Sequence, residues 1–286
     1  MILVVGHKGF VGTHLINFLR RRYETFIVID KNYKGSIKKL LKTFKPDKIF
    51  HLAARLSDSW KDPKGTILNN IVPEINLFEA IRELELDPIV LIPGSSDEYG
   101  ISKCPIKETA PLKPISPYGV SKLTQEALAY QYWKAYGIKV VLTRAFIHEG
   151  PGRSPQFAIS NFAKQIADIE KGKETTLYVG NLDAVRDFTD VRDIVKAYWL
   201  ATEKCKYGEP YNVCSGKGTS VRDALDILMS FSKAKIGIVQ KVDRLRPSDI
   251  SESIGDCTKF KKATGWEPKI PLKKTLYDTL QYWRNN

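Results

Sequence analysis

The residues best suited to chemistry are a tyrosine and a lysine, Tyr118 and Lys122, that stand four positions apart. In a helix this spacing puts both side chains on one face. An ammonium group beside a phenol favours the phenolate, so we expect Lys122 to lower the pKa of Tyr118. A tyrosine tuned in this way can act as a general acid or base, and the lysine can also donate to a bound ribose. We predict a catalytic pair, although this spacing is common in structural helices too.

Two serines, Ser95 and Ser96, end an apolar run earlier in the chain. A hydroxyl at this place could donate a hydrogen bond to the substrate oxygen that Tyr118 protonates. Turn formation is the alternative role for such serines. Together with Tyr118 and Lys122 they are the predicted catalytic residues.

A glycine-rich loop near the N-terminus reads GxxGxxG, with glycines at Gly6, Gly9 and Gly12. Such glycines let the backbone turn sharply and approach a pyrophosphate, which binds at the N-terminus of the following helix. We therefore predict that the loop binds a dinucleotide, with Phe10 and Val11 as further contacts.

An acidic residue, Asp30, ends the next apolar run. A carboxylate there can accept hydrogen bonds from the adenosine ribose, which favours NAD over NADP. Lys31 follows directly and would tolerate a 2′-phosphate. NAD(H) or NADP(H) is therefore the predicted cofactor, with NAD(H) slightly favoured.

These residues need a framework of parallel strands to bring them together. Short apolar runs alternate with amphipathic segments through the first half of the chain, which predicts a doubly wound parallel sheet of Rossmann type, covered on both faces. The predicted strands are 2–5, 26–30, 49–54, 89–92 and 140–146, and the predicted helices are 13–22, 36–44, 66–84 and 117–136.

The regular alternation of strand and helix patterns weakens after Gly150, which predicts a smaller mixed α/β lobe. We expect residues 1–150 to form the cofactor-binding domain, with 178–202 returning to it. Residues 151–177 and 203–286 would form the substrate lobe.

Composition is that of a globular protein, with 43% hydrophobic residues and a formal net charge of +13. The charge indicates a lysine-rich surface or a field that attracts anionic ligands such as nucleotides. The sequence contains no basic tract interleaved with aromatic residues, so it gives no indication of nucleic-acid binding. The four cysteines and four histidines lack zinc-ligand spacing, so we expect no metal. The apolar run Met1 to Val5 is too short for a signal peptide or a membrane span, which predicts a cytoplasmic protein.

Taken together, these motifs resemble the extended short-chain dehydrogenase/reductase family, which includes NAD-dependent epimerases and dehydratases. The resemblance covers essentially the whole chain. It rests on the glycine loop, HLAA from His51 to Ala54, SSDEYG from Ser95, and SPYGVSK ending at Lys122. It implies that Leu52, Ala53 and Ala54 also contact the cofactor.

Other stretches are similar to the family's GDP-sugar enzymes: 144–152, 179–193, 211–216 and 245–249. The similarity implies that Arg186 and Arg246 bind the GDP pyrophosphate, for which a guanidinium offers fixed paired donors. It implies that Asp249 accepts from ribose hydroxyls. Ile147 stands where the family has an asparagine that meets the sugar nucleotide, so one polar contact is missing.

The resemblance implies an enzyme that uses NAD(P)H to reduce the C4 keto group of a GDP-4-keto-6-deoxyhexose. A GDP-mannose 4,6-dehydratase is the alternative, and it needs a carboxylate to abstract the C5 proton. The family places a glutamate where this chain has Asp97, with Glu98 adjacent, so both are candidate substrate contacts. A nucleotide-sugar 4-epimerase and a non-catalytic nucleotide-binding sensor are the remaining alternatives.

Two further expectations follow from the resemblance. Helices 66–84 and 117–136 carry wide apolar arcs and would pair with those of a second copy, giving a homodimer through a four-helix bundle. The span between Gly12 and His51 is short for the family, so one strand–helix–strand portion is abbreviated. Phe26 to Asp30 is then either the second or the third strand, and as the third strand it would place Asp30 near adenine instead of ribose.

Overall fold

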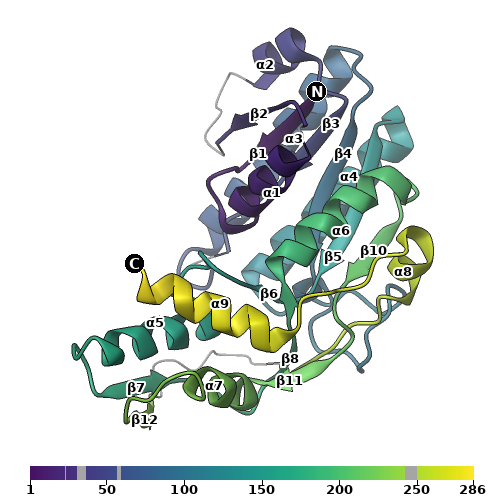
Figure 1. Ribbon diagram of the computed structural model, residues 1–286. Helices are drawn as coiled ribbons and strands as arrows, with labels where there is room; N and C mark the ends of the chain where they lie inside the picture. The colour runs from purple at the N-terminus through teal and green to yellow at the C-terminus, as the bar shows by residue number, and fades with distance from the viewer. Residues whose placement is uncertain (23, 31–36, 57–58, 242–249) are drawn as a thin grey trace.

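The computed structural model describes residues 1–22, 24–30, 37–56, 59–241 and 250–286. Its centre is a parallel sheet of six strands in the order β10-β5-β4-β3-β1-β2 (Figure 1). The strands are β1 (Ile2–Val5), β2 (Phe26–Ile29), β3 (Lys48–His51), β4 (Ile89–Ser95), β5 (Lys139–Ala145) and β10 (Pro210–Val213). Because all six run the same way, their carboxyl ends meet at one edge, where ligands bind in such folds.

Helices cover both faces of this sheet, as predicted. One face carries α1 (Phe10–Arg21) and α6 (Val191–Lys204), and the other carries α2 (Ile37–Phe44), α3 (Pro63–Glu83) and α4 (Pro117–Tyr136). Alternate residues of β1 serve the two cores, since Val4 packs with α1 and α6 whereas Leu3 and Val5 pack with the other set. The Rossmann-type fold class is therefore confirmed.

The position of β2 in the sheet shows whether it corresponds to the second or the third strand of a doubly wound fold. It pairs with β1 in register from Ile2 against Phe26 to Val5 against Ile29. In a doubly wound sheet the strand beside the first strand is the second one, and the third lies outside it. The described sheet ends at β2, so Asp30 follows the second strand and the reading of this segment as the third strand is wrong.

A second group of elements forms a smaller layer around its own apolar core. Helices α5, α7 and α9 pack there with short strands, seen at the lower part of Figure 1. The elements are α5 (Ala158–Glu170), β7 (Thr176–Val179), β8 (Val185–Asp187), β11 (Gly218–Ser220), α7 (Val221–Met229), β12 (Gly237–Gln240), β13 (Glu252–Ser253) and α9 (Leu272–Arg284). Two short strands, β6 (His148–Glu149) and β9 (Thr189–Asp190), pair with each other where the two groups meet.

The predicted lobe boundaries need two corrections. Strand β10, assigned above to the second lobe, is the edge strand of the main sheet beside β5, and α8 (Thr258–Thr264) packs on it. Within 178–202, only α6 packs against the main sheet, because β7 pairs with β12 and β8 pairs with β11 and β13. The assignment of cofactor to one group and sugar nucleotide to the other remains a prediction.

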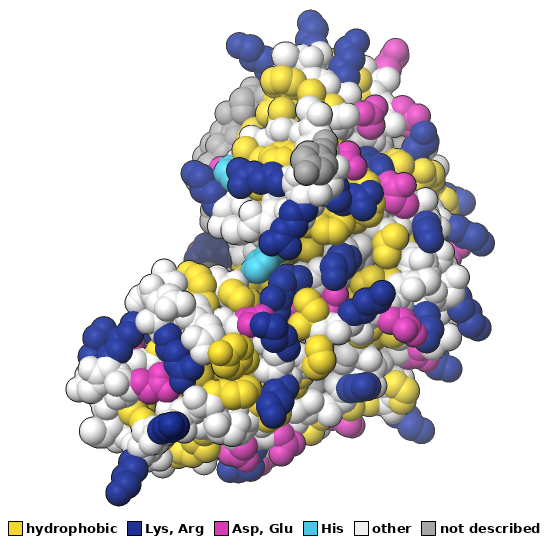
Figure 2. Space-filling view, viewed as in Figure 1, with side chains coloured by type: hydrophobic (Ala, Val, Ile, Leu, Met, Phe, Trp, Pro, Cys, Tyr) yellow, Lys and Arg dark blue, Asp and Glu magenta, His cyan; other side chains and the backbone are white. Residues whose placement is uncertain are grey.

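The visible surface is rich in basic side chains. Figure 2 shows Lys and Arg spread over this face and interspersed with acidic groups, with no single basic strip. Within the described ranges, no helix has the length and apolarity needed to cross a bilayer. The same residues contain no group of three or more His, Cys, Asp or Glu arranged for a metal ion.

Candidate active site

The glycine loop turns tightly at the carboxyl end of β1. Gly6 has φ +85°, and a Cβ there would lie 2.8 Å from the Ala53 backbone nitrogen. A Cβ on Gly12 would lie 2.3 Å from the Gly6 carbonyl oxygen. Neither position therefore accepts a side chain without moving the backbone. Gly9 is the N-cap of α1 and provides no side-chain acceptor, so the first N–H groups of α1 are available to an anion.

The HLAA stretch lies directly beside this loop. Leu52 donates its backbone N–H to the Val5 carbonyl at 2.9 Å, which continues the β1–β3 pairing. Ala53 is buried against Gly6, and Ala54 is exposed. The structure therefore brings the predicted loop and HLAA contacts together at one edge of the sheet. Asp30 lies at the same edge and forms an ion pair with Lys8 at 3.4 Å.

The serine-rich end of β4 lies against the start of α4. Ser95 caps the short 3₁₀ helix Ser96–Glu98 and accepts from the Asp97 N–H at 3.2 Å. A Cβ on Gly119 would lie 2.5 Å from the Asp97 carbonyl, so the Asp97 backbone packs directly on the residue after Tyr118. Ser95 is half-buried and Ser96 is buried, which makes Ser95 the more accessible hydroxyl.

The pKa of Tyr118 differs from the expectation drawn from the sequence. Burial raises the pKa of its phenol above the ordinary value, and the nearby Asp97 carboxylate adds to the rise. The expected lowering by Lys122 is not met, because burial outweighs it; the Lys122 ammonium donates to Gln125 at 2.8 Å. A phenol with a raised pKa is neutral at neutral pH, which is the form that donates a proton.

Glu98 is buried beside the site and is not exposed to a substrate, contrary to its prediction as a substrate contact. The residue is fully buried, and its Oε1 accepts from the Ser95 backbone N–H at 2.7 Å. Its Oε2 lies 3.5 Å from the Arg144 Nε. Burial and the neighbouring Glu126 raise the pKa of Glu98 well above its ordinary range. Glu98 therefore acts as a structural cap, and Asp97 is the carboxylate next to Tyr118.

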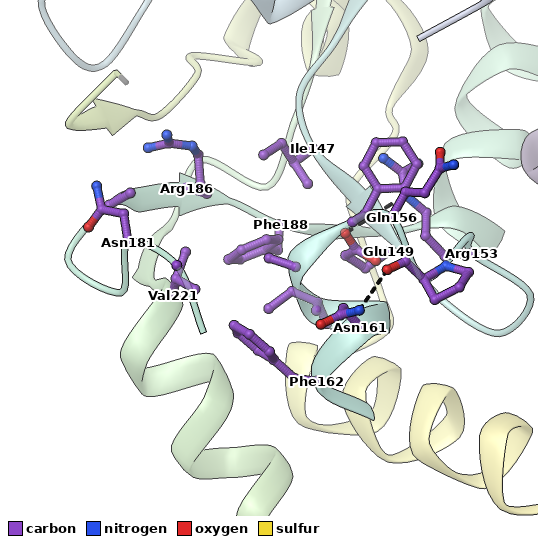
Figure 3. Close-up of a pocket in the computed structure, with 16 residues that line it drawn as sticks. Ile147, Glu149, Arg153, Gln156, Asn161, Phe162, Asn181, Arg186, Phe188 and Val221 are labelled. Carbon is purple, nitrogen blue, oxygen red and sulfur yellow. Dashed lines mark hydrogen bonds and ion pairs between the residues drawn. The ribbon is translucent and has the colours of Figure 1, made fainter. Parts of the chain in front are cut away.

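A cavity of about 460 Å³ opens beyond the sheet edge. Arg186 and Asn181 lie at one side of it and Glu149 and Arg153 at the other, with Ile147 above (Figure 3). The sixteen lining residues are Ile147, Glu149, Arg153, Pro155, Gln156, Phe157, Ala158, Ile159, Asn161, Phe162, Gly180, Asn181, Ala184, Arg186, Phe188 and Val221. The structure thus brings two predicted substrate residues, Ile147 and Arg186, to one cavity. Of the other four, Asp97 and Glu98 do not line this cavity, and Arg246 and Asp249 lie outside the described residues.

Two residues that sequence reasoning left out of the site, Glu149 and Arg153, line the cavity beside Ile147. Glu149 is buried, and its Oε1 lies 3.9 Å from the Arg153 Nε. Burial raises the pKa of Glu149 to about 7, and the Arg153 charge opposes that rise. The Arg153 guanidinium centre lies 4.0 Å from the Phe157 ring centroid and 5.1 Å from that of Phe10. Glu149 lies within 144–152 and Arg153 directly follows it, and the similarity of that stretch to the family's GDP-sugar enzymes was the available signal.

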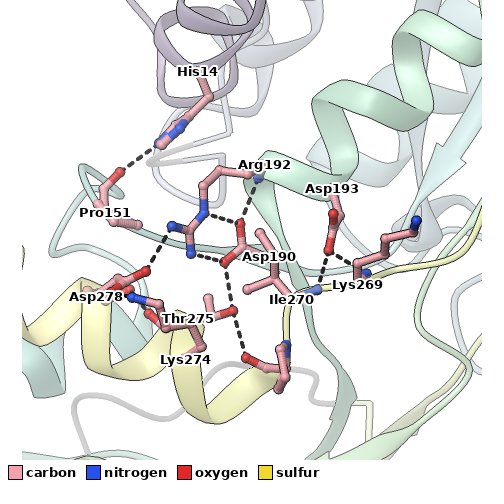
Figure 4. A network of polar contacts seen from close by, with 12 residues as sticks. His14, Pro151, Asp190, Arg192, Asp193, Lys269, Ile270, Lys274, Thr275 and Asp278 are labelled. Atoms are coloured by element: carbon pink, nitrogen blue, oxygen red, sulfur yellow. Dashed lines mark hydrogen bonds and ion pairs between the residues drawn. The ribbon is translucent and has the colours of Figure 1, made fainter.

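A buried acidic residue ties this region to the rest of the chain (Figure 4). Asp190 caps α6, accepting from the Arg192 N–H and Nε at 2.8 Å each, and it also accepts from the Thr275 hydroxyl at 2.7 Å. Arg192 reaches Asp278 on α9 at 2.8 Å. These contacts fix the strand pair β6–β9, and with it Glu149, against α6 and α9.

The parallel sheet with its glycine loop, together with the paired Tyr118 and Lys122, defines a short-chain dehydrogenase/reductase of the extended type, an NAD(P)-dependent enzyme class. The chain belongs to the GDP-mannose 4,6 dehydratase family, whose profile matches residues 26–279.

Relatives with named activities cover nearly the whole chain. GDP-6-deoxy-D-mannose reductase of Pseudomonas aeruginosa is 31% identical over 99% of this chain and 97% of its own length. GDP-6-deoxy-D-talose 4-dehydrogenase of Aggregatibacter actinomycetemcomitans is 32% identical over 98% and 96%. The solved structure of RMD from Pseudomonas aeruginosa complexed with NADPH has a TM-score of 0.90 at 31% identity, covering 99% of both chains.

The residues present fit a nicotinamide dinucleotide. Gly6 and Gly12 let the loop pack against itself and against Ala53 more closely than a side chain would allow, and the N-terminus of α1, which has no side-chain cap, follows this loop. Tyr118 and Lys122 lie near the N-terminal end of α4, at the same edge of the sheet. The glycine loop would hold the pyrophosphate, and Leu52 with Ala53 would line the cofactor's path across the edge.

Replacing Gly12 by alanine tests the glycine loop. The added Cβ would meet the Gly6 carbonyl at 2.3 Å, so the loop must shift. We expect the Kd for NADH and NADPH to rise at least about tenfold, measured by fluorescence titration. Gly237→Ala is the control, because its Cβ would lie 3.7 Å from the closest atom. Equal affinities for the Gly12 variant and the unmodified protein would contradict the assignment.

Replacing Asp190 by alanine tests the network of Figure 4. The change removes the α6 cap and leaves Arg192 and the buried Thr275 hydroxyl without this acceptor. We expect the free energy of unfolding to fall by about 3 kcal/mol in urea titrations. Asp183→Ala removes an exposed pair with Arg222 and should cost less than about 0.5 kcal/mol. Similar losses for both variants would argue against a special role for Asp190.

Proposed function

We propose that the chain is an NAD(P)H-dependent reductase that acts on the C4 keto group of a GDP-4-keto-6-deoxyhexose, with a GDP-rhamnose-type product. The observation that carries this proposal is the placement of Tyr118 and Ser95 at the sheet edge, where the charge of Arg153, which lines the same cavity as Arg186, acts on the Tyr118 phenol. The names of the two relatives, a GDP-6-deoxy-D-mannose reductase and a GDP-6-deoxy-D-talose 4-dehydrogenase, support the same substrate class.

Each site residue has a separate role in the proposed carbonyl reduction. The bound nicotinamide supplies hydride to C4 of the sugar. The neutral phenol of Tyr118 donates its proton to the C4 oxygen, which removes the developing negative charge. The Ser95 hydroxyl donates a hydrogen bond to the same oxygen and orients it. The Lys122 ammonium donates to the nicotinamide ribose and stabilises the phenolate that remains on Tyr118.

The nucleotide end of the substrate carries a diphosphate, and the cavity offers positive charge for it. Arg186 lies at one side of the cavity and Arg153 at the other. A guanidinium binds phosphate oxygens with paired donors. We assign Arg186 to the diphosphate, with Arg246 and Asp249 as further proposed contacts to the diphosphate and ribose. Ile147 presents an apolar surface where a related enzyme would have an amide, so sugar contacts there are apolar.

A 4,6-dehydratase is the second candidate, because Asp97 lies next to Tyr118 where a base would be needed. Its side chain is one methylene shorter than the glutamate of the family, and the buried Glu98 cannot substitute for it. This difference favours the reductase.

We also propose that NADH is slightly preferred to NADPH. Asp30 follows β2, the strand next to β1, where a carboxylate would meet the adenosine ribose. Lys8 pairs with that carboxylate and could instead contact a 2′-phosphate. Assays with both cofactors measure the preference directly, and the NADPH in the related structure makes this comparison essential.

The decisive assay offers the protein GDP-4-keto-6-deoxymannose with NADH or NADPH, and separately GDP-mannose alone. We expect loss of cofactor absorbance only with the keto sugar. Tyr118→Phe should lower kcat by about 10²- to 10⁴-fold, the usual contribution of a general acid, with little change in cofactor Kd. Tyr136→Phe is the matched control, since Tyr136 lies exposed at the end of the same helix.

Other outcomes would redirect the assignment. Formation of keto sugar from GDP-mannose, without net cofactor consumption, would replace the reductase by the dehydratase and make Asp97 its base. Full turnover by the Tyr118 variant would exclude the mechanism.

We propose that the protein forms a homodimer through α3 and α4. Both helices carry apolar side chains that remain exposed: Leu68 and Val72 on α3, and Val120 and Tyr130 on α4. The two helices pack against each other on the same face of the sheet, so these side chains are candidates for one continuous surface. Pairing with a second copy would bury it in a four-helix bundle.

Leu68→Glu tests the dimer. A carboxylate buried without a partner opposes association, so we expect a monomer by light scattering where the unmodified protein is a dimer. Ile238→Glu is the control, since Ile238 is an exposed apolar residue on β12, outside this surface. A monomeric unmodified protein would defeat the proposal outright.

A further inference from the structure

The ammonium of Lys122 lies in an unusual place, inside the interface between α3 and α4. Its Nζ donates to the Gln125 Oε1 at 2.8 Å, and the Gln125 Nε2 donates to the Glu74 Oε2 at 2.6 Å. Glu74 is fully buried, and Lys122 and Gln125 are at most 4% exposed. A continuous hydrogen-bonded path therefore joins a carboxyl on α3 to the catalytic lysine on α4.

The path is held rigidly by its surroundings. The Gln125 Nε2 also donates to the Asn70 carbonyl at 3.0 Å, which fixes its amide orientation. The Asn70 side chain donates to the Ser121 hydroxyl at 2.8 Å, and the hydroxyl in turn donates to the Tyr118 carbonyl at 2.7 Å. The same buried layer thus touches the lysine and the backbone of the tyrosine.

The path places an acid deep in the interface. A buried carboxyl costs free energy unless it is paired. The Glu74 Oε1 has no hydrogen-bond partner among the described residues, and the Glu74 Oε2 accepts from Gln125. An apolar side chain would pack here without that cost, which makes a structural purpose alone a poor explanation for Glu74.

The other groups facing Lys122 are poor partners for its charge. His51, from β3, is buried with neither ring nitrogen hydrogen-bonded among the described residues, and burial lowers its pKa to about 4, so it is neutral. Glu98, from the 3₁₀ helix, is held by Ser95 and Arg144, and burial raises its pKa. Tyr118, on the same helix, is a neutral phenol. Glu74 is therefore the acid joined to Lys122 by hydrogen bonds.

We propose that Glu74 is a positioning residue for the reaction, which acts through Gln125 to hold the Lys122 ammonium in its charged form and in reach of the cofactor ribose. Gln125 is the link that transmits both orientation and charge. This role rests on the proposed function only in that Lys122 serves a nicotinamide-dependent reaction.

The sign of the effect follows from the charges. Burial raises the pKa of Glu74 to about 8, and the Lys122 charge opposes that rise, so Glu74 is a carboxylate over the alkaline range. Burial lowers the pKa of Lys122, and in that range the Glu74 carboxylate opposes the lowering. Removing the carboxylate leaves burial less opposed, so Lys122 loses its proton at a lower pH. Because activity needs the ammonium, the loss of activity with rising pH then begins at a lower pH. The alkaline limb of the rate profile therefore moves to lower pH.

The first variant is Glu74→Gln, which keeps the size and the hydrogen bond but removes the charge. We expect the alkaline limb of kcat to move down by about one pH unit or more, with the KM for the sugar nucleotide little changed. Glu79→Gln is the matched control. Glu79 also lies on α3 and contacts α4, through the Tyr132 hydroxyl at 2.7 Å, but it does not contact Lys122.

Relocating the charge separates an electrostatic role from a structural one. The double variant E74Q/Q125E places a carboxylate directly beside the Lys122 Nζ and an amide behind it. We expect it to return the alkaline limb to its original pH or above. Gln125→Met breaks the path while keeping Glu74, so it should shift the limb downward as Glu74→Gln does.

Cofactor binding gives a readout that does not depend on the sugar. The Kd for NADH, titrated by fluorescence from pH 6 to 10, should rise at lower pH in Glu74→Gln than in the unmodified protein. An unshifted limb and an unshifted Kd profile in Glu74→Gln, or an equal shift in Glu79→Gln, would overturn the proposal. Failure of the double variant to restore the limb would do the same. If the unmodified protein did not reduce the keto sugar, the proposed function would fail while the Kd profile still tested Glu74.

Discussion

The close backbone contact between the loop after β1 and the segment after β3 is the constraint on which the rest of the site depends. Gly6 and Gly12 pack against each other and against Ala53 at distances that no side chain allows. This contact places the start of α1 directly over the carboxyl edge of the sheet. The same edge receives Ser95 from β4 and, through the Asp97 backbone, the first turn of α4. The reacting groups are therefore positioned by backbone geometry before any side chain interacts.

Burial then sets the chemistry of these groups. Burial keeps the Tyr118 phenol neutral, whereas the carboxyl groups of Glu74 and Glu98 oppose the lowering of the Lys122 pKa that burial causes. The two effects are complementary, since a proton donor must be protonated before the reaction and its conjugate base must be stabilised afterwards. Glu74 contributes to the second requirement from the far side of the helix interface.

Much of this architecture was predictable from local patterns, and the failures have physical causes. Helix α4 runs from Pro117 to Tyr136 as predicted, because Ser116 caps it and proline occupies its first turn. Strand β10 was assigned to the second lobe because its pairing with β5 is set by long-range packing that no local period encodes. Glu98 was misplaced because a 3₁₀ turn after the strand points it inward. The pKa of Tyr118 depends on burial, which neighbouring residues in the sequence do not reveal. The roles of the remaining site residues are still predictions.

Arg153 has a consequence that reaches beyond either ligand alone. Its guanidinium lies between Phe10, which opens the helix after the glycine loop, and Phe157, which lines the cavity. A ligand that displaced one of these rings would change the interaction of Arg153 with the other ring. Thermodynamic linkage makes such an effect reciprocal, so each ligand would alter the affinity for its counterpart by the same factor. Binding at the loop and binding in the cavity would then be coupled through Arg153.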